Sequence, residues 1–221
     1  MSTTALRNPG PVIQRGTQRT SGGNQHWLKN PTAQKYGCGI IAATDLLLYL
    51  HRSGAAQTPF FHGLPPDPIP WELYDFYADR LRKRCLPLLP PFGLNAWVLA
   101  LGLNRYFQAY RLPYRARWGV LPGELWQKTR AMLSQNIPVI LCIGINFPFP
   151  KHSLPLYPGE GARQQAGSVR AHYVTVTAMD QEWLQISSWG RLYKVRREDL
   201  DRYRKRHSCP LYTNIVHIER R

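Results

Sequence analysis

Cys38 is the first residue whose type and setting could do chemistry. It lies between Gly37 and Gly39, directly before an apolar run that ends near Arg52. After Gly39 no glycine or proline interrupts this run, so we predict a buried helix with Cys38 at its amino end. Unpaired N–H groups and the helix dipole at such an end favour a thiolate. Cys38 is therefore the candidate nucleophile, and its own N–H is a candidate donor to an oxyanion.

His172 is the candidate general base. It opens a strand-like run that reaches Met179, after a loop rich in proline and glycine over residues 146–171. A histidine at the edge of a strand can project into a cleft and accept a proton from a thiol.

A third polar residue could orient the imidazole. Ser187 follows His172 by about one hairpin, so its strand can return beside the strand that bears His172. Asp180 and Ser188 are alternatives for the same role. Trp189 is placed to shield the resulting hydrogen bond from water, which preserves its strength.

The elements that must position these residues fall into two groups. Apolar spacing predicts helices over 38–52, 71–84, 92–106 and 122–136, followed by strands over 137–145, 172–179, 182–187, 191–195 and 211–218. Helices followed by strands indicate an α+β fold with an antiparallel sheet. We predict one domain over 31–221, with a helical lobe (31–136) and a sheet lobe (137–221). Residues 1–30 have few large apolar side chains and are predicted to form a flexible arm.

These motifs resemble those of the papain-like cysteine peptidases, in particular the branch that removes double-glycine leader peptides from bacteriocins. The matching text is Tyr36-Gly37-Cys38-Gly39, then Ala171-His172-Tyr173, then Ser187-Ser188-Trp189-Gly190, and the likeness spans residues 30–205. The resemblance implies a nucleophile on a central helix, packed on a carboxy-terminal antiparallel sheet, and no cofactor.

Two details of the resemblance depart from the family pattern. Relatives commonly have Asn or Asp where this chain has Ser187, whose hydroxyl is shorter. Relatives also place a Gln a few residues before the cysteine to complete the oxyanion hole. We assign that role to Gln34, because Gln25 lies farther from Cys38.

Composition limits the other classes of function. The 221 residues carry a formal net charge of +16, which favours an anionic partner. No signal peptide or long apolar segment is visible, so we expect a soluble, cytoplasmic protein. The four cysteines form no CxxC motif and the histidines lack metal-ligand spacing, so reduced thiols and no metal are expected.

The sequence leaves several functions open. A peptide or isopeptide bond, cleaved through a thioester intermediate, is the expected target of a Cys38–His172 pair. An amidase or a transglutaminase-type acyl transfer would use the same residues. A catalytically weak or inactive fold that serves as a binding module is an alternative, and nucleic-acid binding rests on the charge alone.

Overall fold

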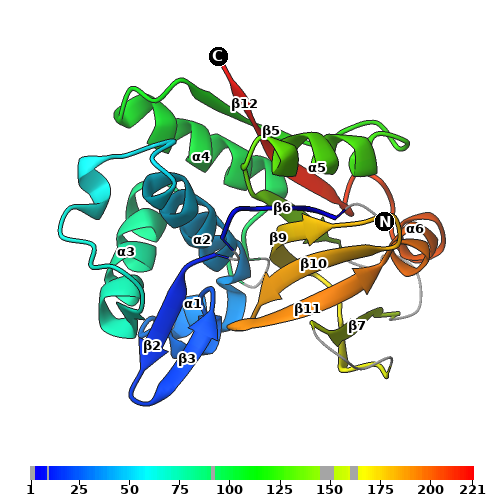
Figure 1. The fold of residues 1–221 in the computed structure, drawn as a ribbon, viewed down its shortest axis with the longest axis horizontal. Helices are drawn as coiled ribbons and strands as arrows, with labels where there is room; N and C mark the ends of the chain where they lie inside the picture. Colours follow the sequence, from blue (N-terminus) through cyan, green and yellow to red (C-terminus); the bar gives the residue numbers. More distant parts are fainter. Residues whose placement is uncertain (1–2, 9, 91–92, 145–151, 160–163) are drawn as a thin grey trace.

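The computed structural model describes residues 3–8, 10–90, 93–144, 152–159 and 164–221. It confirms the α+β class: helices cover a large antiparallel sheet (Figure 1). The helices are α1 (Pro31–Tyr36), α2 (Cys38–Arg52), α3 (Trp71–Arg84), α4 (Ala96–Ala109), α5 (Leu125–Ser134) and α6 (Arg197–Arg206), with short 3-10 turns η1 (Gln25–Trp27) and η2 (Pro59–Phe61).

The main sheet has the order β5-β12-β6-β9-β10-β11-β7-β8, and β1 also pairs with β9. Its strands are β1 (Thr4–Ala5), β5 (Tyr114–Trp118), β6 (Val139–Ile143), β7 (Leu154–Pro158), β8 (Gly167–Val169), β9 (His172–Met179), β10 (Trp183–Ser188), β11 (Arg191–Arg196) and β12 (Asn214–Arg220). A second, small sheet contains β2 (Val12–Arg15), β3 (Gln18–Ser21) and β4 (Ile69–Pro70).

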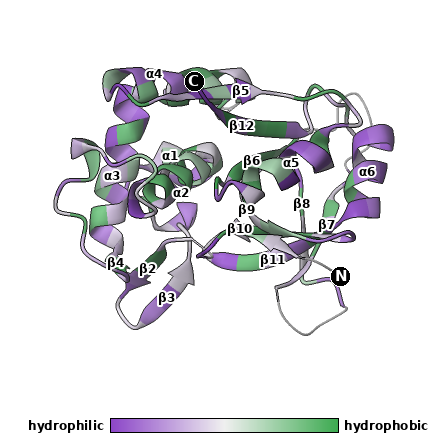
Figure 2. Ribbon diagram, turned by 45° about the horizontal axis from the view of Figure 1, so that its top comes forward, coloured by the Kyte–Doolittle hydropathy of each residue, from purple (hydrophilic) through white to green (hydrophobic). Residues whose placement is uncertain are grey.

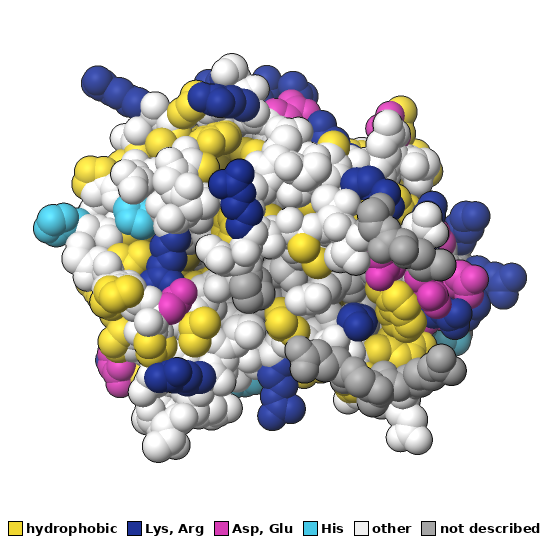
Figure 3. Space-filling view, in the orientation of Figure 1, with side chains coloured by type: hydrophobic (Ala, Val, Ile, Leu, Met, Phe, Trp, Pro, Cys, Tyr) yellow, Lys and Arg dark blue, Asp and Glu magenta, His cyan; other side chains and the backbone are white. Residues whose placement is uncertain are grey.

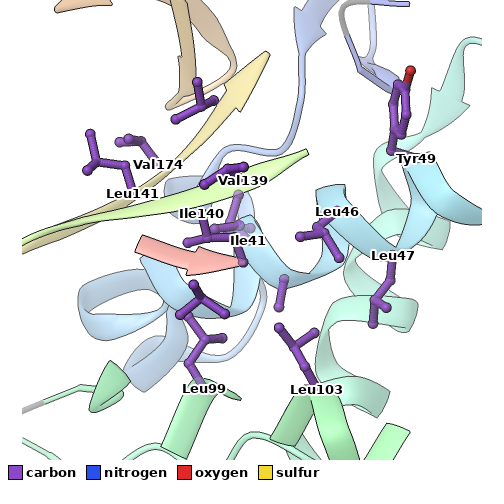
Figure 4. Close-up of a cluster of buried hydrophobic side chains, with 14 of the residues drawn as sticks. Ile41, Leu46, Leu47, Tyr49, Leu99, Leu103, Val139, Ile140, Leu141 and Val174 are labelled. Carbon is purple, nitrogen blue, oxygen red and sulfur yellow. The ribbon is translucent and has the colours of Figure 1, made fainter. Parts of the chain in front are cut away.

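Helix α2 is the centre of the molecule. Every residue from Gly39 to Leu50 is buried, as expected for a helix that is apolar on nearly all sides. Figure 4 shows why: side chains of α2 such as Ile41 and Leu46 lie between those of the sheet, including Ile140, and those of α4, including Leu103. In Figure 2 the inner strands β6, β9 and β12 are coloured largely hydrophobic, whereas α6 is mostly hydrophilic.

The predicted helices over 38–52 and 71–84 have the observed bounds, and the strand over 172–179 is also exact. The third helix begins at Ala96, because the Asn95 side chain caps it by accepting from the Trp97 N–H. The sequence did not predict β5 or α6, nor β7 and β8, which lie within the expected loop over 146–171. Residues 146–151 and 160–163 of that loop lie outside the described residues.

The prediction of a flexible arm over 1–30 is corrected by the structure. The described residues of this segment form β1, β2, β3 and η1, and Leu6, Ile13 and Leu28 join the hydrophobic core. β1 extends the main sheet by pairing with the end of β9, and β3 approaches the β10–β11 turn, where the Ser21 N–H donates to the Gly190 carbonyl at 3.0 Å. A few deeply buried apolar side chains thus hold a segment whose average composition is polar.

Among the described residues no helix combines the length and the apolar character that a bilayer crossing requires.

Candidate active site

Cys38 is the first residue of α2, where the helix leaves N–H groups without intrahelical partners. Gly37 caps the helix, and a Cβ on it would stand 2.3 Å from the Ala33 carbonyl oxygen, so only glycine allows α1 to approach this closely. The N–H groups of Tyr173 and Gly39 point at the Cys38 sulfur and favour its thiolate. Burial outweighs them and raises the pKa of the Cys38 thiol.

His172 is the first residue of β9, and its side chain is buried. Its Nε2 is 2.8 Å from the Ser188 Oγ at the end of β10. Burial, together with a smaller contribution from the nearby His26, lowers the pKa of His172 to about 4. The imidazole is therefore neutral at pH 7, the form that a general base requires.

The ring of Trp189 stacks on the ring of His172, with centroids 4.5 Å apart and an interplanar angle of 22°. Trp189 and Gly190 form the two-residue turn between β10 and β11, and both have positive φ, 49° and 74°. Positive φ at both positions is the geometry of a type I′ hairpin, which is unfavourable for a bulky residue such as tryptophan. This strained turn holds the ring over the imidazole and its bond to Ser188.

These side chains meet at one small cavity of about 10 Å³. Cys38, His172, Ser188 and Trp189 line it, together with Gln25 from η1. The structure thus places the predicted cysteine and histidine, which are far apart in the sequence, at the same cavity.

Ser187, the predicted orienting residue, does not contact the imidazole. Its Oγ donates to the Ser21 carbonyl oxygen at 2.8 Å and so ties β10 to the amino-terminal segment. Asp180 is also remote, because it follows the last residue of β9 and its Oδ1 accepts from the N–H groups of Glu182 and Trp183 in the β9–β10 turn. Of the three alternatives, the structure places only Ser188 beside His172.

Gln34, the predicted oxyanion residue, lies outside the cavity. Its side chain is exposed, and its Nε2 donates to the Leu28 carbonyl oxygen at 2.7 Å. Gln25 occupies the position at the cavity instead, with its Nε2 donating to the Gln34 carbonyl oxygen at 3.2 Å. Its Oε1 is buried without a hydrogen-bond partner among the described residues. Gln25 was set aside in the sequence analysis because of its distance from Cys38 along the chain. The glycine pair Gly22-Gly23, two residues upstream, is a signal of close backbone approach that could have pointed to it.

Asp45 is a buried carboxylate at the same cavity that the sequence analysis did not single out. Both of its oxygens accept from the Gly23 N–H at 3.1 Å, and its Oδ1 accepts from the Tyr74 hydroxyl at 2.8 Å. A Cβ on Gly22 would lie 2.6 Å from the Asp45 Oδ2, so this glycine lets the backbone pass. Asp45 therefore fixes the chain two residues before Gln25. Burial raises the pKa of Asp45 to about 7.

Asp45→Asn is expected to steepen the rise of stability with pH between about pH 4 and 7. The folded protein binds a proton on Asp45 more tightly than the unfolded chain, so this group contributes stability at low pH that is lost as the pH rises to 7. His172 has the opposite sign, because its pKa is lowered from 6.5 to about 4 on folding, and its contribution grows over pH 4 to 6.5. Of these two opposing contributions, Asp45→Asn keeps only that of His172, so its stability rises more steeply with pH than that of the wild type.

The measurement is the urea midpoint of both proteins at several pH values from 4.5 to 7.5. Groups common to the two proteins cancel in the difference, which isolates Asp45. Parallel profiles would contradict the raised pKa of this carboxyl.

A larger hollow of about 830 Å³ lies between α5, β5 and β12, and its lining includes Trp118 and Leu211. It contains no cysteine. Within this hollow Glu219 forms ion pairs with Arg117 and Lys128, so the charge of its carboxylate is already paired. The described part of the chain holds no group of three or more His, Cys, Asp or Glu side chains that could bind a metal ion.

Comparison with known proteins gives a result at the level of the fold. No family model and no curated protein matches this chain. Among solved structures, the crystal structure of a Bacillus anthracis protein assigned as a C39-like peptidase is similar, with a TM-score of 0.51 at 12% sequence identity. The alignment covers 100% of this chain and 99% of that one. The likeness is one of fold, and it confirms the papain-like, C39-like architecture that the sequence motifs indicated.

Proposed function

We propose that this protein is a cysteine peptidase in which Cys38 attacks a peptide or isopeptide carbonyl. The observation that carries the proposal is the meeting of Cys38, at the start of the central helix, and a neutral buried His172 at one cavity. The C39-like fold supports it, because a peptidase-like fold supplies the setting in which such a pair is used. The four cysteines are free, and of these Cys38 has a histidine beside it at the same cavity.

The geometry defines the direction of proton transfer. With the Nε2–H of His172 donating to Ser188 Oγ, the lone pair lies on Nδ1, which is the nitrogen left for the Cys38 thiol. Nδ1 takes the thiol proton as the sulfur attacks the carbonyl carbon, and the oxyanion forms beside the Cys38 N–H. His172 then gives the proton to the leaving amine, and water hydrolyses the thioester.

Gln25 provides a second donor to the oxyanion in this proposal. Its amide nitrogen carries two protons, of which the Gln34 carbonyl uses one. The Asp45 carboxylate and the Gly23 N–H hold the preceding backbone and restrict where the amide can lie.

Labelling with a peptidyl epoxysuccinate tests the proposal directly. We expect one equivalent of probe on Cys38, with inactivation that accelerates as the pH rises towards the raised pKa of the thiol. His172→Ala should slow labelling by about 100-fold, the range for losing a general base. Equal labelling of Cys38 and Cys209, or the same rate in His172→Ala, would favour a binding module with the same fold.

Ser188→Ala is expected to slow this inactivation by about 10-fold, whereas Ser187→Ala is expected to change it less than about 2-fold. The Ser188 hydroxyl holds the imidazole at 2.8 Å, and losing such a bond costs roughly 1 kcal/mol or somewhat more. Ser187 serves as the matched control because it is the residue next to Ser188 on β10. Its hydroxyl donates to the Ser21 carbonyl oxygen instead of contacting the imidazole. The measurement is the second-order rate constant of inactivation for each variant. A larger loss in Ser187→Ala than in Ser188→Ala would assign the orienting role to Ser187 instead of Ser188.

A further inference from the structure

The elements around Cys38 carry a group of exposed cations. Lys35 is three residues before Cys38 on α1, Arg170 is two residues before His172, and Arg191 is the cross-strand partner of Ser188. Arg19 on β3 completes the group, and all four side chains are exposed. We call Arg19, Lys35, Arg170 and Arg191 the basic rim.

Carboxylates are missing from the same elements. The sequences of η1, α1, α4, β2, β3 and β8 to β11 contain no Asp or Glu, and the one in α2 is the buried Asp45. Exposed acids lie elsewhere: Glu182 is beyond the opposite end of β9, and Glu198 is on α6. On the face shown in Figure 3, Asp and Glu gather mainly at the right edge, over α6, where they intermingle with Lys and Arg.

Within the described part of the chain, the basic rim is therefore not neutralised by ion pairs. The ion pairs of the described residues engage other cations, such as Arg82, Arg117 and Arg196, and none includes a member of the rim. Unpaired charges of one sign around a cleft raise the local concentration of oppositely charged substrate and accelerate its capture.

We propose that the site selects acidic polypeptide segments, with Asp or Glu side chains flanking the scissile bond held by the basic rim. This inference rests on the proposed peptidase function, because a thiol nucleophile requires a carbonyl that a nucleic acid backbone does not offer. Lys35, Arg170 and Arg191 come from three separate elements, α1, the β8–β9 connection and the start of β11. Each is within three residues of Cys38 or His172 along the chain or is paired with Ser188 across the hairpin, so in this proposal they meet a substrate chain on both sides of the cleaved bond.

Protection of Cys38 from iodoacetamide tests the proposal without a known substrate. The protectants are an alternating Glu-Ala decapeptide, its Gln-Ala counterpart and a ten-nucleotide oligothymidylate. At low salt the Glu peptide should slow alkylation of Cys38 about 5-fold, and high salt should abolish the effect because it screens exposed charges. The Gln peptide should give no protection, and peptide mapping by mass spectrometry reports the Cys38 rate.

Two triple variants of equal charge localise the effect. Lys35→Gln/Arg170→Gln/Arg191→Gln should lose the protection. The control, Arg84→Gln/Arg105→Gln/Arg220→Gln, should keep it, because these exposed residues lie towards the far ends of α3, α4 and β12. Equal protection by the Gln peptide, or loss in both variants, would overturn the proposal. So would protection by the oligonucleotide alone, which would indicate a nucleic-acid site.

The outcome is separable from the peptidase proposal. If Cys38 reacts with iodoacetamide no faster in the wild type than in His172→Ala, the peptidase assignment fails. The protection pattern still reports in that case whether the basic rim binds acidic peptide.

Discussion

Cys38→Ala is expected to abolish peptide hydrolysis, with a loss of at least about 10⁴-fold in kcat, while the melting temperature changes by no more than a few degrees. Removing a nucleophile costs the covalent pathway and leaves only the contribution of binding and oxyanion donors. The fold should tolerate the change, since alanine is a better helix former than cysteine and the residue is only partly buried.

Cys142→Ala is the matched control for this experiment. Cys142 is buried in β6, opposite Tyr173 of β9. Its loss should lower stability by about 1 kcal/mol through lost packing and leave the chemical step intact. Turnover that survived in Cys38→Ala, or vanished in Cys142→Ala, would show that the nucleophile had been assigned to the wrong thiol.

The central helix and the strand that begins with His172 were predictable because their signals are local. A run free of proline after Gly39, followed by Ser53 and Gly54, determines where α2 begins and ends. The β-branched and aromatic residues of β9 likewise predict a strand with His172 at its start. The positions of Cys38 and His172 follow from these elements, so the predicted pair meets in the folded protein.

The choice between Ser187 and Ser188 could not be made from the sequence. Successive residues of a strand face opposite sides, so a shift of one residue exchanges the two hydroxyls. β10 has a register shift between Gln185 and Ile186, after which Ser187 pairs with Thr175. Ser187 and Thr175 therefore share one face of the sheet, and Ser188, the next residue, projects to the other face. His172 also projects to that other face, because it is three residues, an odd number, before Thr175.

The amino-terminal segment was misjudged for a different reason. Composition averaged over 30 residues is polar, but the segment is held by partners far away in the sequence. Asp45 bonds the Gly23 N–H, Ser187 bonds the Ser21 carbonyl, and β1 pairs with β9. None of these long-range contacts has a signature in local composition. The position of Gln25 depends on them, so it could not be predicted either.

Gln25→Ala is expected to lower kcat by about 10² to 10³-fold, with a much smaller change in KM. A donor that contacts the oxyanion acts on the transition state more than on bound substrate, and removing one such donor costs roughly 3 to 4 kcal/mol in comparable sites. The Gln25 side chain faces the cavity that Cys38 and His172 line, and Asp45 fixes the backbone that carries it.

Gln34→Ala separates this assignment from the one that the sequence favoured. Gln34 is exposed and bonds the Leu28 carbonyl, so its truncation should change kcat less than about 3-fold, as expected for a surface hydrogen bond. Its backbone carbonyl, which accepts from the Gln25 Nε2, is kept in that variant. The decisive measurement is kcat and KM for wild type and both variants on one peptide amide. A large kcat loss in Gln34→Ala with none in Gln25→Ala would restore the sequence-based assignment, whereas the reverse establishes that the amino-terminal segment completes the oxyanion hole.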